Sequence, residues 1–385
     1  MRAVVLAAGE GIRLRPLTLT RPKHLIPVGG KPLLEHLLTS VKTAGLKEVL
    51  IVVHYMGERI QSFFGDGSKL GLQIKYVFQK EMRGTADAIG TAEPLVEDDF
   101  LLIYGDLQIS PNAIKQVLNS HLKEKPTVTM AVVPVKQPEN YGIVKLDGSR
   151  VTEIFEKPTK EAPTNLANGG IYVFSTEIFQ KIRQTDISSR GELEITDSLR
   201  LLLNEKQPVI AVPISGEEWL DVGRPWDLFE ANERVLSQTE PVVEGEIEDG
   251  AHLIGRVSVA KGARIRSGAY IRGPVFIGED SDIGPNCYIR PHTSIGRHVR
   301  IGNACEIKNS IILDETRIGH LSYVGDSVLG EECNFGAGTI VANYRLDGKT
   351  VKMTVKDEIV DSGRTKLGVI LGDRVKTGIN SVFMP

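Results

Sequence analysis

Residues 259–313 read VAKGAR IRSGAY IRGPVF IGEDSD IGPNCY IRPHTS IGRHVR IGNACE IKNSII L, and an aliphatic residue opens each group of six. The fourth position after the aliphatic residue is usually small. A repeat of six with this pattern indicates a parallel β-helix, because each hexad forms one side of a coil and the aliphatic side chains of stacked coils share a core. The aliphatic positions are Val259, Ile265, Ile271, Ile277, Ile283, Ile289, Ile295, Ile301, Ile307 and Leu313.

The hexads resemble those of the left-handed form, in which three hexads complete one triangular coil of about 18 residues. We expect this domain to cover residues 251–385, and we expect its last coils to be missing because the chain stops at Pro385 within a hexad. The pattern fails after Leu313, where the next aliphatic residue, Ile318, follows after five positions rather than six. A stretch without hexads at 342–366 predicts a loop that leaves the coils, and such loops often carry function.

Residues 1–232 have a different pattern, in which apolar runs of strand length alternate with amphipathic helical spacing. The runs at 3–8, 49–53, 100–104, 128–135, 171–174 and 209–212 predict strands, and the leucine spacing at 33–41 predicts a helix that ends near Gly45. This alternation predicts an α/β domain with a mostly parallel mixed sheet, which binds ligands beyond the carboxyl ends of its strands. Residues 233–250 are interpreted as a linker between the two domains.

The composition of the 385 residues argues against several classes of function. The 46 basic and 49 acidic residues leave a net charge of −3, which gives no reason to expect nucleic acid or a membrane as a partner. No apolar run reaches the length of about 18 residues that a membrane span needs, and the N-terminus does not resemble a signal peptide. The three cysteines lack a C-x-x-C pair, so we expect buried thiols and a cytoplasmic protein.

The segment after the first expected strand could bind a polyphosphate. Gly9 and Gly11 would let backbone N–H groups approach phosphate oxygens closely, and Arg13 and Lys23 add positive charge. The segment is neither a P-loop, since it lacks G-K-[ST], nor a dinucleotide fingerprint, since Leu14 stands where the third glycine would be. Glycines also occur in ordinary strand-to-helix turns, so the two glycines alone are weak evidence for a phosphate site. The prediction depends on their combination with the basic residues Arg13 and Lys23.

The runs LAAGEGIRLRPLT (6–18) and PKHLIPV (22–28) together resemble the signature of the sugar-1-phosphate nucleotidylyltransferases. Members of this family have a Rossmann-like nucleotidyltransferase domain, couple a sugar 1-phosphate to a nucleoside triphosphate and release pyrophosphate. The resemblance implies that Arg13 and Lys23 neutralise the leaving pyrophosphate and that Gln79 pairs with a uracil or thymine edge. One departure is Ile12, where the family usually has Thr or Ser. The implied nucleotide-binding residues are Leu6, Ala8, Gly9, Gly11, Gln79, Gly84 and Thr85.

Further segments resemble the metal and sugar sites of the same family. The resemblance implies that Asp106, in YGD, and Asp221, in WLDVG, hold Mg²⁺ between the phosphates of both substrates. Catalysis would then rest on positioning and charge neutralisation. Asp106 could instead cap a helix, Asp221 could be structural, and Glu156 with Lys157 could be a solvated surface pair. The implied sugar-phosphate ligands are Gly142, Glu156, Lys157, which would orient the attacking phosphate, and Asn168.

The β-helix segment resembles the acetyltransferase half of the bifunctional sugar-1-phosphate nucleotidylyltransferase/acetyltransferases, in their archaeal version. The matching runs are GHLSYVGD (319–326), NFGAGTI (334–340) and ANY (342–344). The resemblance implies acetyl-CoA as co-substrate, a homotrimer with the site between prisms, and His320 as the base that takes a proton from the sugar amine. His320 also lies at the first break in the hexad pattern, which a purely structural coil would not need.

The resemblance also implies a set of residues around His320. Arg290 and Lys308 would bind the sugar phosphate, and Tyr323, Asn334, Asn343, Tyr344 and Lys366 would line the amino-sugar pocket. Lys349 and Lys352, in the stretch 342–366, would meet the substrate or the phosphates of CoA, although a basic surface loop is an equally good interpretation of this pair.

We therefore predict a bifunctional enzyme that acetylates glucosamine 1-phosphate and then transfers UMP from UTP to give UDP-N-acetylglucosamine. The alternative is a monofunctional UTP or dTTP glucose-1-phosphate nucleotidylyltransferase with a structural or regulatory β-helix. A guanylyltransferase is disfavoured by Gln79, and a regulatory subunit is disfavoured because Arg13, Lys23, Asp106 and Asp221 are all present. The expected partners are small molecules only, namely UTP or dTTP, sugar 1-phosphates and acetyl-CoA.

Overall fold

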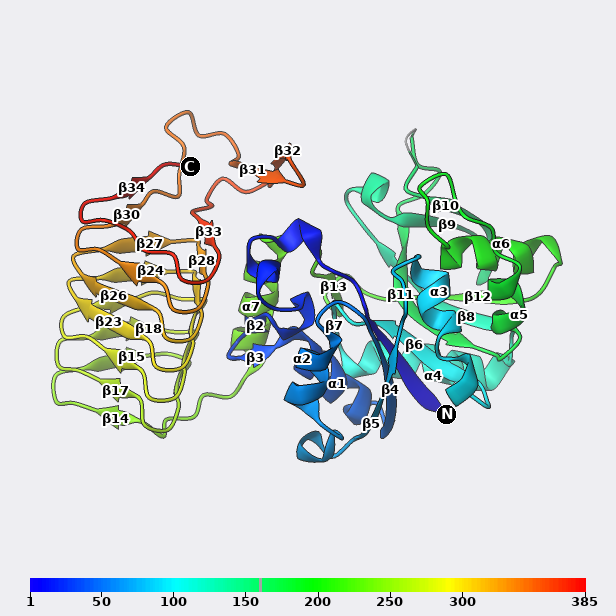
Figure 1. Cartoon of the computed structure of the whole chain (residues 1–385), viewed down its shortest axis with the longest axis horizontal. Helices are drawn as coiled ribbons and strands as arrows, with labels where there is room; N and C mark the ends of the chain where they lie inside the picture. The colour runs from blue at the N-terminus through cyan, green and yellow to red at the C-terminus, as the bar shows by residue number, and fades with distance from the viewer. Residues whose placement is uncertain (159–160) are drawn as a thin grey trace. The chain divides into compact units, whose positions relative to one another are not determined.

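A computed structural model describes residues 1–158 and 161–385, and in this part of the chain two compact units form (Figure 1). The first unit consists of Met1–Glu10 and Leu33–Asp221, and the second of Gly11–Pro32 and Val222–Pro385. These units divide the chain at other places than the predicted boundaries, because the segment Gly11–Pro32 and the helix after Asp221 pack with the coils. The stretch 233–250 contains the end of that helix and the first coil strand, and the domain boundaries stay a prediction.

The first unit is built, in its described residues, on a nine-stranded sheet of order β5-β4-β1-β6-β11-β8-β12-β10-β9. Its strands are β1 (Arg2–Ala7), β4 (Glu48–Val53), β5 (Gln73–Phe78), β6 (Phe100–Tyr104), β8 (Val128–Pro134), β9 (Gly142–Asp147), β10 (Arg150–Glu156), β11 (Leu166–Phe174) and β12 (Val209–Pro213).

The sheet is parallel in one half only, so the prediction of a mostly parallel sheet was wrong for the other half. Strands β5, β4, β1 and β6 run parallel, and β12 is parallel to β8. From β11 onward the remaining pairs are antiparallel in the described residues, including the β9–β10 hairpin. Strand β11 is buried along most of its length, and its run Ile171–Phe174 is apolar whichever way the strand points, so its direction could not be predicted from the pattern.

Helices cover this sheet with their apolar faces. The expected helix at 33–41 is α1, and Leu33, Leu34, Leu37, Leu38 and Val41 are all buried on it. Gly45 follows the helix with φ of 105°, which favours glycine. The helices of this unit are α1 (Leu33–Thr43), α2 (Gly57–Phe64), α3 (Thr85–Gly90), α4 (Pro111–Glu124), α5 (Ile178–Arg183) and α6 (Ile195–Asn204), with short 3-10 turns at Ser68–Leu70, Glu93–Leu95 and Pro138–Asn140.

The second unit contains the predicted coils as three parallel sheets, which we call the first, second and third faces (Figure 1). The first face has β14 (Glu246–Ile247), β17 (Arg264–Ile265), β20 (Asp282–Ile283), β23 (Arg300–Asn303), β26 (Arg317–His320) and β29 (Asn334–Phe335). The second has β15 (His252–Ile254), β18 (Tyr270–Arg272), β21 (Tyr288–Ile289), β24 (Glu306–Lys308), β27 (Tyr323–Gly325), β30 (Ile340–Val341) and β34 (Val382–Phe383). The third has β16 (Val257–Val259), β19 (Val275–Ile277), β22 (Thr293–Ile295), β25 (Ile311–Ile312), β28 (Val328–Leu329) and β33 (Ile370–Leu371).

The coils confirm the hexad pattern but move its break. Ile271 pairs with Ile289, eighteen residues later, whereas Ile295 pairs with Ile312, seventeen residues later. The inward residue of this coil is therefore Ile312 and not the expected Leu313. The hexad that lacks one residue is shortened in the turn at Asn309, before β25. The sequence alone could not locate this turn, because Ile311, Ile312 and Leu313 are all apolar.

The stretch 342–366 leaves the three faces, as expected, and includes a two-stranded hairpin of β31 (Lys352–Val355) and β32 (Glu358–Asp361). The three cysteines are free and buried in the coils. Burial raises the pKa of the Cys287 thiol to about 12, which keeps it protonated and inert. No helix in the described residues is long and apolar enough to cross a membrane.

The remaining elements of the second unit come from the segment Gly11–Pro32, which we call the signature loop, and from helix α7 (Asp227–Gln238). The buried Asn232 of α7 accepts a hydrogen bond from the Gly29 N–H at 2.8 Å and donates one to the His292 carbonyl oxygen at 2.8 Å. One side chain therefore joins the loop, the helix and the coils. The loop contains 3-10 turns at Ile12–Leu14, Leu17–Leu19 and Lys23–Leu25, with β2 (Pro27–Val28) and β3 (Lys31–Pro32).

Candidate active sites

The two aspartates predicted to bind metal lie in adjacent backbone segments at a small ribbon of the first unit. Strand β7 (Leu107–Ile109) pairs antiparallel with β13 (Trp219–Asp221), and the partner of Asp221 is Leu107, the residue after Asp106. The Gly105 N–H donates to the Leu6 carbonyl oxygen at 2.8 Å, so the turn that carries Asp106 lies at the end of β1. Segments far apart in the sequence thus bring both carboxylates to the carboxyl end of the parallel strands.

This donor set fits Mg²⁺ shared with substrate phosphates. Mg²⁺ is usually bound by one or two carboxylates, with phosphate oxygens and water completing its octahedron. No group of three or more His, Cys, Asp or Glu side chains that could hold a metal occurs in the described residues. A cation at Asp106 and Asp221 would therefore depend on the substrates for its remaining ligands.

The segment predicted to read the base lies at the end of β5 and the start of α3. The Gln79 side chain is 4% exposed, and its amide N–H donates to Asp87 at 2.7 Å, which fixes the orientation of the amide. Gly84 has φ of 121°, and a Cβ atom there would lie 2.4 Å from the Leu193 carbonyl oxygen, so the position requires glycine. The Thr85 hydroxyl accepts from the Ile195 N–H at 3.0 Å.

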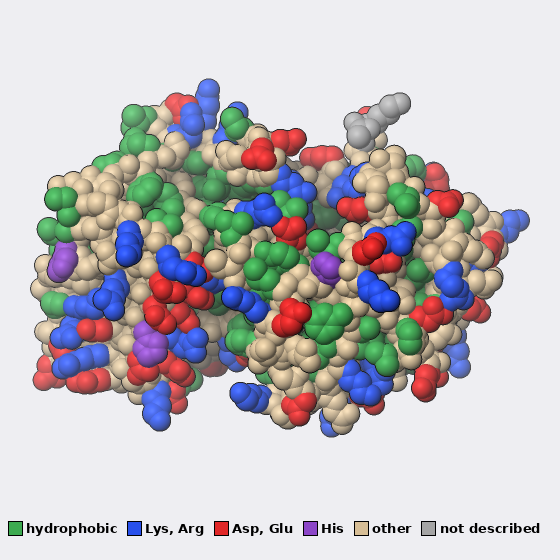
Figure 2. All heavy atoms as spheres, viewed as in Figure 1, with side chains coloured by type: hydrophobic (Ala, Val, Ile, Leu, Met, Phe, Trp, Pro, Cys, Tyr) green, Lys and Arg blue, Asp and Glu red, His purple; other side chains and the backbone are tan. Residues whose placement is uncertain are grey.

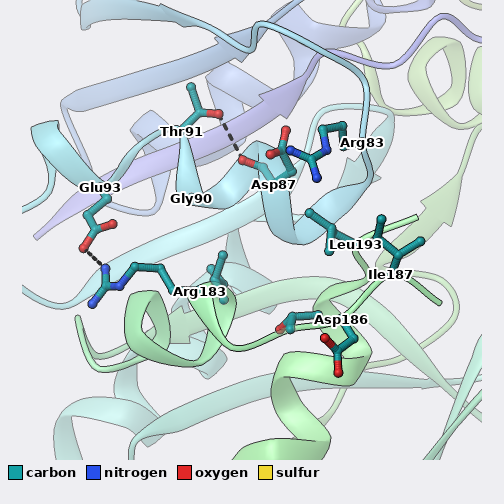
Figure 3. A pocket seen from close by; sticks show the side chains of 11 residues that line it. Arg83, Asp87, Gly90, Thr91, Glu93, Arg183, Asp186, Ile187 and Leu193 are labelled. Atoms are coloured by element: carbon teal, nitrogen blue, oxygen red, sulfur yellow. Dashed lines mark hydrogen bonds and ion pairs between the residues drawn. The ribbon is translucent and has the colours of Figure 1, made fainter. Parts of the chain in front are cut away.

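A polar hollow of about 470 Å³ lies behind this segment, between α3, α5 and residues 185–193 (Figure 3). Asp87, the partner of Gln79, lines it, and its backbone carbonyl accepts from the Thr91 hydroxyl at 3.0 Å. Arg183 and Glu93 form an ion pair across it. Its acidic and basic side chains do not define one class of ligand, and none of the predicted site residues lines it.

Three of the predicted sugar-phosphate ligands lie together. Gly142 and Glu156 are partners in the β9–β10 hairpin, and a Cβ atom on Gly142 would lie 3.0 Å from a Glu156 carboxylate oxygen and 3.7 Å from the Asn168 Cβ. Burial and the nearby Glu194 raise the pKa of Glu156. Lys157 follows directly, with φ of 41°.

Residues that were not predicted from the sequence complete this sugar cluster. Arg190 pairs with Glu156 at 3.3 Å and with Glu194 at 2.8 Å, and the Thr196 hydroxyl donates to Glu156 at 3.1 Å. The available signal was RGELEIT (190–196), a charged run directly before an amphipathic helix. The guanidinium of Arg190 adds a cation beside the place where a sugar phosphate is expected.

Arg13 and Lys23 belong to the signature loop and so to the second unit, whereas the metal carboxylates belong to the first. A Cβ atom on Gly11 would lie 3.0 Å from the Lys23 Cβ, so the absent side chain allows close packing. A Cβ atom on Gly223 would lie 2.9 Å from the Arg13 guanidinium. Burial raises the pKa of Asp227 to about 6, against hydrogen bonds from the Arg224 and Gly223 N–H groups and the charges of Arg224 and Arg13.

On the second face of the coils, one carboxylate organises several residues predicted for acetyl transfer. Asp326, whose side chain is 3% exposed, pairs with Lys308 at 2.7 Å and accepts from the Asn309 amide at 2.7 Å. Asn343 donates to Asp326 and, at 3.2 Å, to the Tyr323 hydroxyl. The sequence analysis missed Asp326, although it ends the matching run GHLSYVGD. Arg290 lies one coil below Lys308 and pairs with Glu306 at 2.8 Å.

The other predicted acetyl-transfer residues lie outside this network. His320 is exposed at the end of β26 and pairs in regular register with Asn303, so the expected coincidence with the register break was wrong. Asn334 is exposed on the first face, and Tyr344 forms a backbone bridge with the exposed Lys366. Lys349 and Lys352 are exposed in the stretch 342–366. No hydrogen bond or ion pair within the described residues joins these side chains to the Asp326 network.

Acidic and basic side chains are interspersed over the coils in view in Figure 2. Many of them form ion pairs between neighbouring coils, such as Arg266 with Asp282 at 2.5 Å and Arg297 with Asp314 at 2.8 Å. This mixture agrees with the net charge of −3, and it leaves no large area of one sign on the side of the coils that is in view.

The chain matches two protein families over most of its length. The nucleotidyl transferase family matches residues 2–238, and the GMPPB C-terminal domain matches residues 271–377. Together they cover both the sheet domain and most of the coils.

Similar proteins extend the match to the whole chain. The bifunctional protein GlmU of Methanocaldococcus jannaschii is 45% identical, over 100% of this chain and 91% of that protein. A bifunctional sugar-1-phosphate nucleotidylyltransferase/acetyltransferase of Sulfurisphaera tokodaii is 40% identical, over 100% of this chain and 93% of that protein. A solved UDP-glucose pyrophosphorylase complexed with UDP-glucose has a TM-score of 0.56 and 27% identity, and covers 62% of this chain and 99% of its own.

Proposed function

This chain belongs to the nucleotidyl transferase family, and on that premise we propose that it makes UDP-N-acetylglucosamine in two reactions. The first acetylates the amine of glucosamine 1-phosphate with acetyl-CoA. The second transfers UMP from UTP to the resulting N-acetylglucosamine 1-phosphate and releases pyrophosphate. Relatives named as bifunctional align with the whole chain, which supports one protein with both activities.

The observation that carries the nucleotidyl transfer is the meeting of Asp106 and Asp221 at the β7–β13 ribbon. Mg²⁺ held there would partly neutralise the negative charge on the phosphates of both substrates. A phosphate oxygen of the sugar attacks the α-phosphorus of UTP in line, and the bond to the pyrophosphate oxygen breaks. Lys157 orients the attacking phosphate, and Arg13 and Lys23 neutralise the leaving pyrophosphate.

Substrate choice in this reaction rests on two clusters of the first unit. The amide of Gln79, oriented by Asp87, would pair with the edge of uracil, beside the backbone at Gly84. Glu156 and Asn168 would bind sugar hydroxyls next to the bare backbone of Gly142. The Glu156 carboxylate is partly held by Arg190, so the cluster is ordered before a sugar enters.

The acetyl transfer would use residues of the second face of the coils together with His320 and Asn334 of the first face. The sugar amine attacks the thioester carbonyl carbon, the carbon–sulfur bond breaks, and the CoA thiolate leaves. His320 takes the proton that the amine loses. Arg290 and Lys308 would bind the sugar phosphate, with Tyr323, Asn334, Asn343, Tyr344 and Lys366 around the sugar and Lys349 and Lys352 toward phosphate groups.

We further propose that the coils are left-handed and assemble as a homotrimer in the cytoplasm. Six-residue sides and coils of about 18 residues support the left-handed form. His320, Asn334 and Lys366 are exposed and outside the Asp326 network, so a neighbouring prism could complete the site. Three buried free thiols suit a reducing compartment.

A second candidate is a monofunctional UTP or dTTP glucose-1-phosphate nucleotidylyltransferase with structural coils. The similarity to a solved UDP-glucose pyrophosphorylase favours it, since that chain matches the sheet domain almost entirely. Acetyl transfer distinguishes the two candidates.

The test follows thiol release from acetyl-CoA with glucosamine 1-phosphate, in the parent and in His320→Ala. We expect release in the parent and a loss of about 10²-fold or more in the variant, as for removal of a general base. His298→Ala, which changes another exposed histidine of the coils, serves as the matched control and should keep parental activity. If the parent releases no thiol with any amino-sugar phosphate, the monofunctional candidate replaces this proposal.

A further inference from the structure

The signature loop is bound to the coils by a buried cluster that neither proposed reaction uses directly. Arg21, two residues before Lys23, pairs with Asp373 at 2.5 Å and with Glu331 at 2.9 Å. The side chains of Arg21 and Asp373 are 7% and 6% exposed. The Thr20 hydroxyl also donates to Asp373, at 2.6 Å. Two consecutive loop residues therefore end on one buried carboxylate.

Asp373 and Glu331, which we call the coil corner, are fixed by the coils themselves. They follow β33 and β28, whose residues Leu371 and Leu329 are partners. The second oxygen of Asp373 accepts from the Glu331 N–H at 2.8 Å, and the Arg374 N–H donates to the Glu331 carbonyl oxygen at 2.8 Å. One oxygen of the Asp373 carboxylate thus accepts hydrogen bonds from the loop, and the other accepts one from the adjacent coil.

The loop also packs directly on this corner. A Cβ atom on Gly372 would lie 3.2 Å from the Pro16 Cβ, so the glycine allows Pro16 to approach the backbone of the coil. Contact at Pro16, Thr20 and Arg21 holds the middle of the loop, while Asn232 holds its end at Gly29. The loop is therefore fixed at two places, by the coils in its middle and by helix α7 at its end.

The residues held in this way lie between the two cationic groups of the nucleotidyl reaction. The Thr18 hydroxyl donates to the Gly11 carbonyl oxygen at 2.9 Å, and Lys23 packs against Gly11. Arg21 thus lies within a closed turn that starts near Arg13 and ends at Lys23. A shift of this turn by about 1 Å would misplace both cations, and misplacement of that size lowers rates strongly.

We propose that the coil corner positions the signature loop for nucleotidyl transfer, with Asp373 and Glu331 acting through Arg21 on Lys23 and Arg13. This inference rests on the proposed nucleotidyl transfer. It makes Arg21, Asp373 and Glu331 positioning residues, and it gives the coils a role in the reaction of the other unit that is separate from acetyl transfer. Removal of Arg21 would leave the buried charge of Asp373 uncompensated, and removal of Asp373 would leave Arg21 with Glu331 alone, whose side chain is 44% exposed, so in either case the loop would shift.

The test measures pyrophosphate release from UTP and N-acetylglucosamine 1-phosphate in Asp373→Asn and Arg21→Gln. We expect kcat/KM for UTP to fall about 10- to 100-fold in each, with a higher KM for UTP and an unchanged KM for the sugar phosphate. The double variant should be no worse than either single variant, because both remove the same interaction. Arg21→Lys, which keeps the charge, should recover part of the loss, and Thr20→Val should show a smaller loss in the same direction.

The matched control is Asp314→Asn, in the same column of the coils. Asp314 accepts from the Arg297 N–H at 2.8 Å and pairs with the Arg297 side chain, but that arginine belongs to the coils and not to the loop. This variant should keep kcat/KM for UTP within about twofold of the parent, since exposed pairs contribute little. Melting temperatures of all variants show whether a loss reflects unfolding.

Four results would overturn the inference. In the first, Asp373→Asn keeps the kcat/KM for UTP of the control Asp314→Asn. In the second, Asp373→Asn loses kcat alone, in proportion to the loss of folded protein, and its KM for UTP is unchanged. If Asp373→Asn does not fold, parental kinetics in Thr20→Val and Arg21→Lys would overturn it. A parent that releases no pyrophosphate with any sugar phosphate overturns the proposed nucleotidyl transfer, and the inference with it, which separates that failure from the others.

Discussion

The two units bring their functional residues together by different means. In the first unit, Asp106 and Asp221 are far apart in the sequence and meet only because β7 and β13 pair. In the coils, Arg290 and Lys308 lie in adjacent coils because of a fixed repeat. A tertiary site of the first kind depends on the whole sheet, whereas a stacked site of the second kind depends on local register.

This difference has a consequence for variants. A substitution at the ribbon should affect only the reaction that needs both carboxylates. A substitution in the stack should affect only the reaction on that face. The coil corner at Asp373 is the exception that we infer, since it lies in the coils and acts on the signature loop.

The largest expected effect tests the tertiary site. Asp106→Asn should lower kcat for pyrophosphate release by roughly 10²- to 10³-fold, because one of two carboxylates that fit Mg²⁺ loses its charge. Thiol release should stay within about twofold of the parent, since the residues proposed for acetyl transfer belong to the other unit. Asp98→Asn, an exposed aspartate of the same unit, is the control. Retained pyrophosphate release in Asp106→Asn would remove the ribbon from the reaction.

The next effect tests the stacked site. Asp326→Asn should lower thiol release about 10- to 100-fold, because a neutral amide cannot hold both Lys308 and Asn343 in place. Pyrophosphate release should be unaffected. Asp282→Asn, which breaks a carboxylate–arginine pair on the first face, is the matched control. Equal losses in the two variants would mean that the Asp326 network is only structural.

A backbone effect of intermediate size sharpens the tertiary side of the comparison. Gly84→Ala should destabilise the first unit by about 1–3 kcal/mol, because φ of 121° and ψ of −179° suit glycine alone. The KM for UTP should also rise, since Leu193 must move away from the base-reading segment. Urea unfolding and UTP saturation measure the two effects, with Gly90→Ala as the control. An unchanged KM for UTP would separate Gly84 from nucleotide binding.

The smallest effect is a pH dependence at the start of α7. Asp227 has a folded pKa of about 6, raised by burial from an ordinary value of 3.8. The folded state therefore holds this proton more tightly, and the contribution of Asp227 to the free energy of unfolding should fall as the pH rises from about 4 to about 6. Asp227→Asn does not titrate, so its stability relative to the parent should rise over this range and then level off.

The net gain at pH 7 should be about 1 kcal/mol, because hydrogen bonds from the Gly223 and Arg224 N–H groups to a neutral amide are weaker than those to a carboxylate. Urea unfolding at pH 4, 5, 6 and 7 measures the difference. A stability difference that does not change with pH would mean that Asp227 does not titrate in this range.

Much of the fold could be predicted from the sequence, because periodicity reports burial directly. The hexads predicted the coils, and the leucine spacing predicted α1 with its buried face. Strand direction in the second half of the sheet could not be predicted, since buried strands such as β11 are apolar in either direction. The choice between Ile312 and Leu313 also failed, because three apolar residues in succession leave the inward position undefined.

The candidate sites were predicted less evenly. Residues within motifs, such as Gln79 and Asn168, were predicted from resemblance, and their roles stay predictions. Arg190 and Asp326 were missed because their importance lies in partners distant in the sequence or in an adjacent coil. The coil corner was also invisible, since nothing in the sequence shows that Arg21 and Asp373 meet.

The most direct test of two separate reactions in one chain crosses two variants with two assays. His320→Ala and Asp106→Asn are each given glucosamine 1-phosphate with acetyl-CoA, and, separately, N-acetylglucosamine 1-phosphate with UTP and Mg²⁺. We predict that His320→Ala loses thiol release and keeps pyrophosphate release, and that Asp106→Asn shows the reverse. Loss of both activities in either variant, or no thiol release from the parent, would contradict the account of two independent sites.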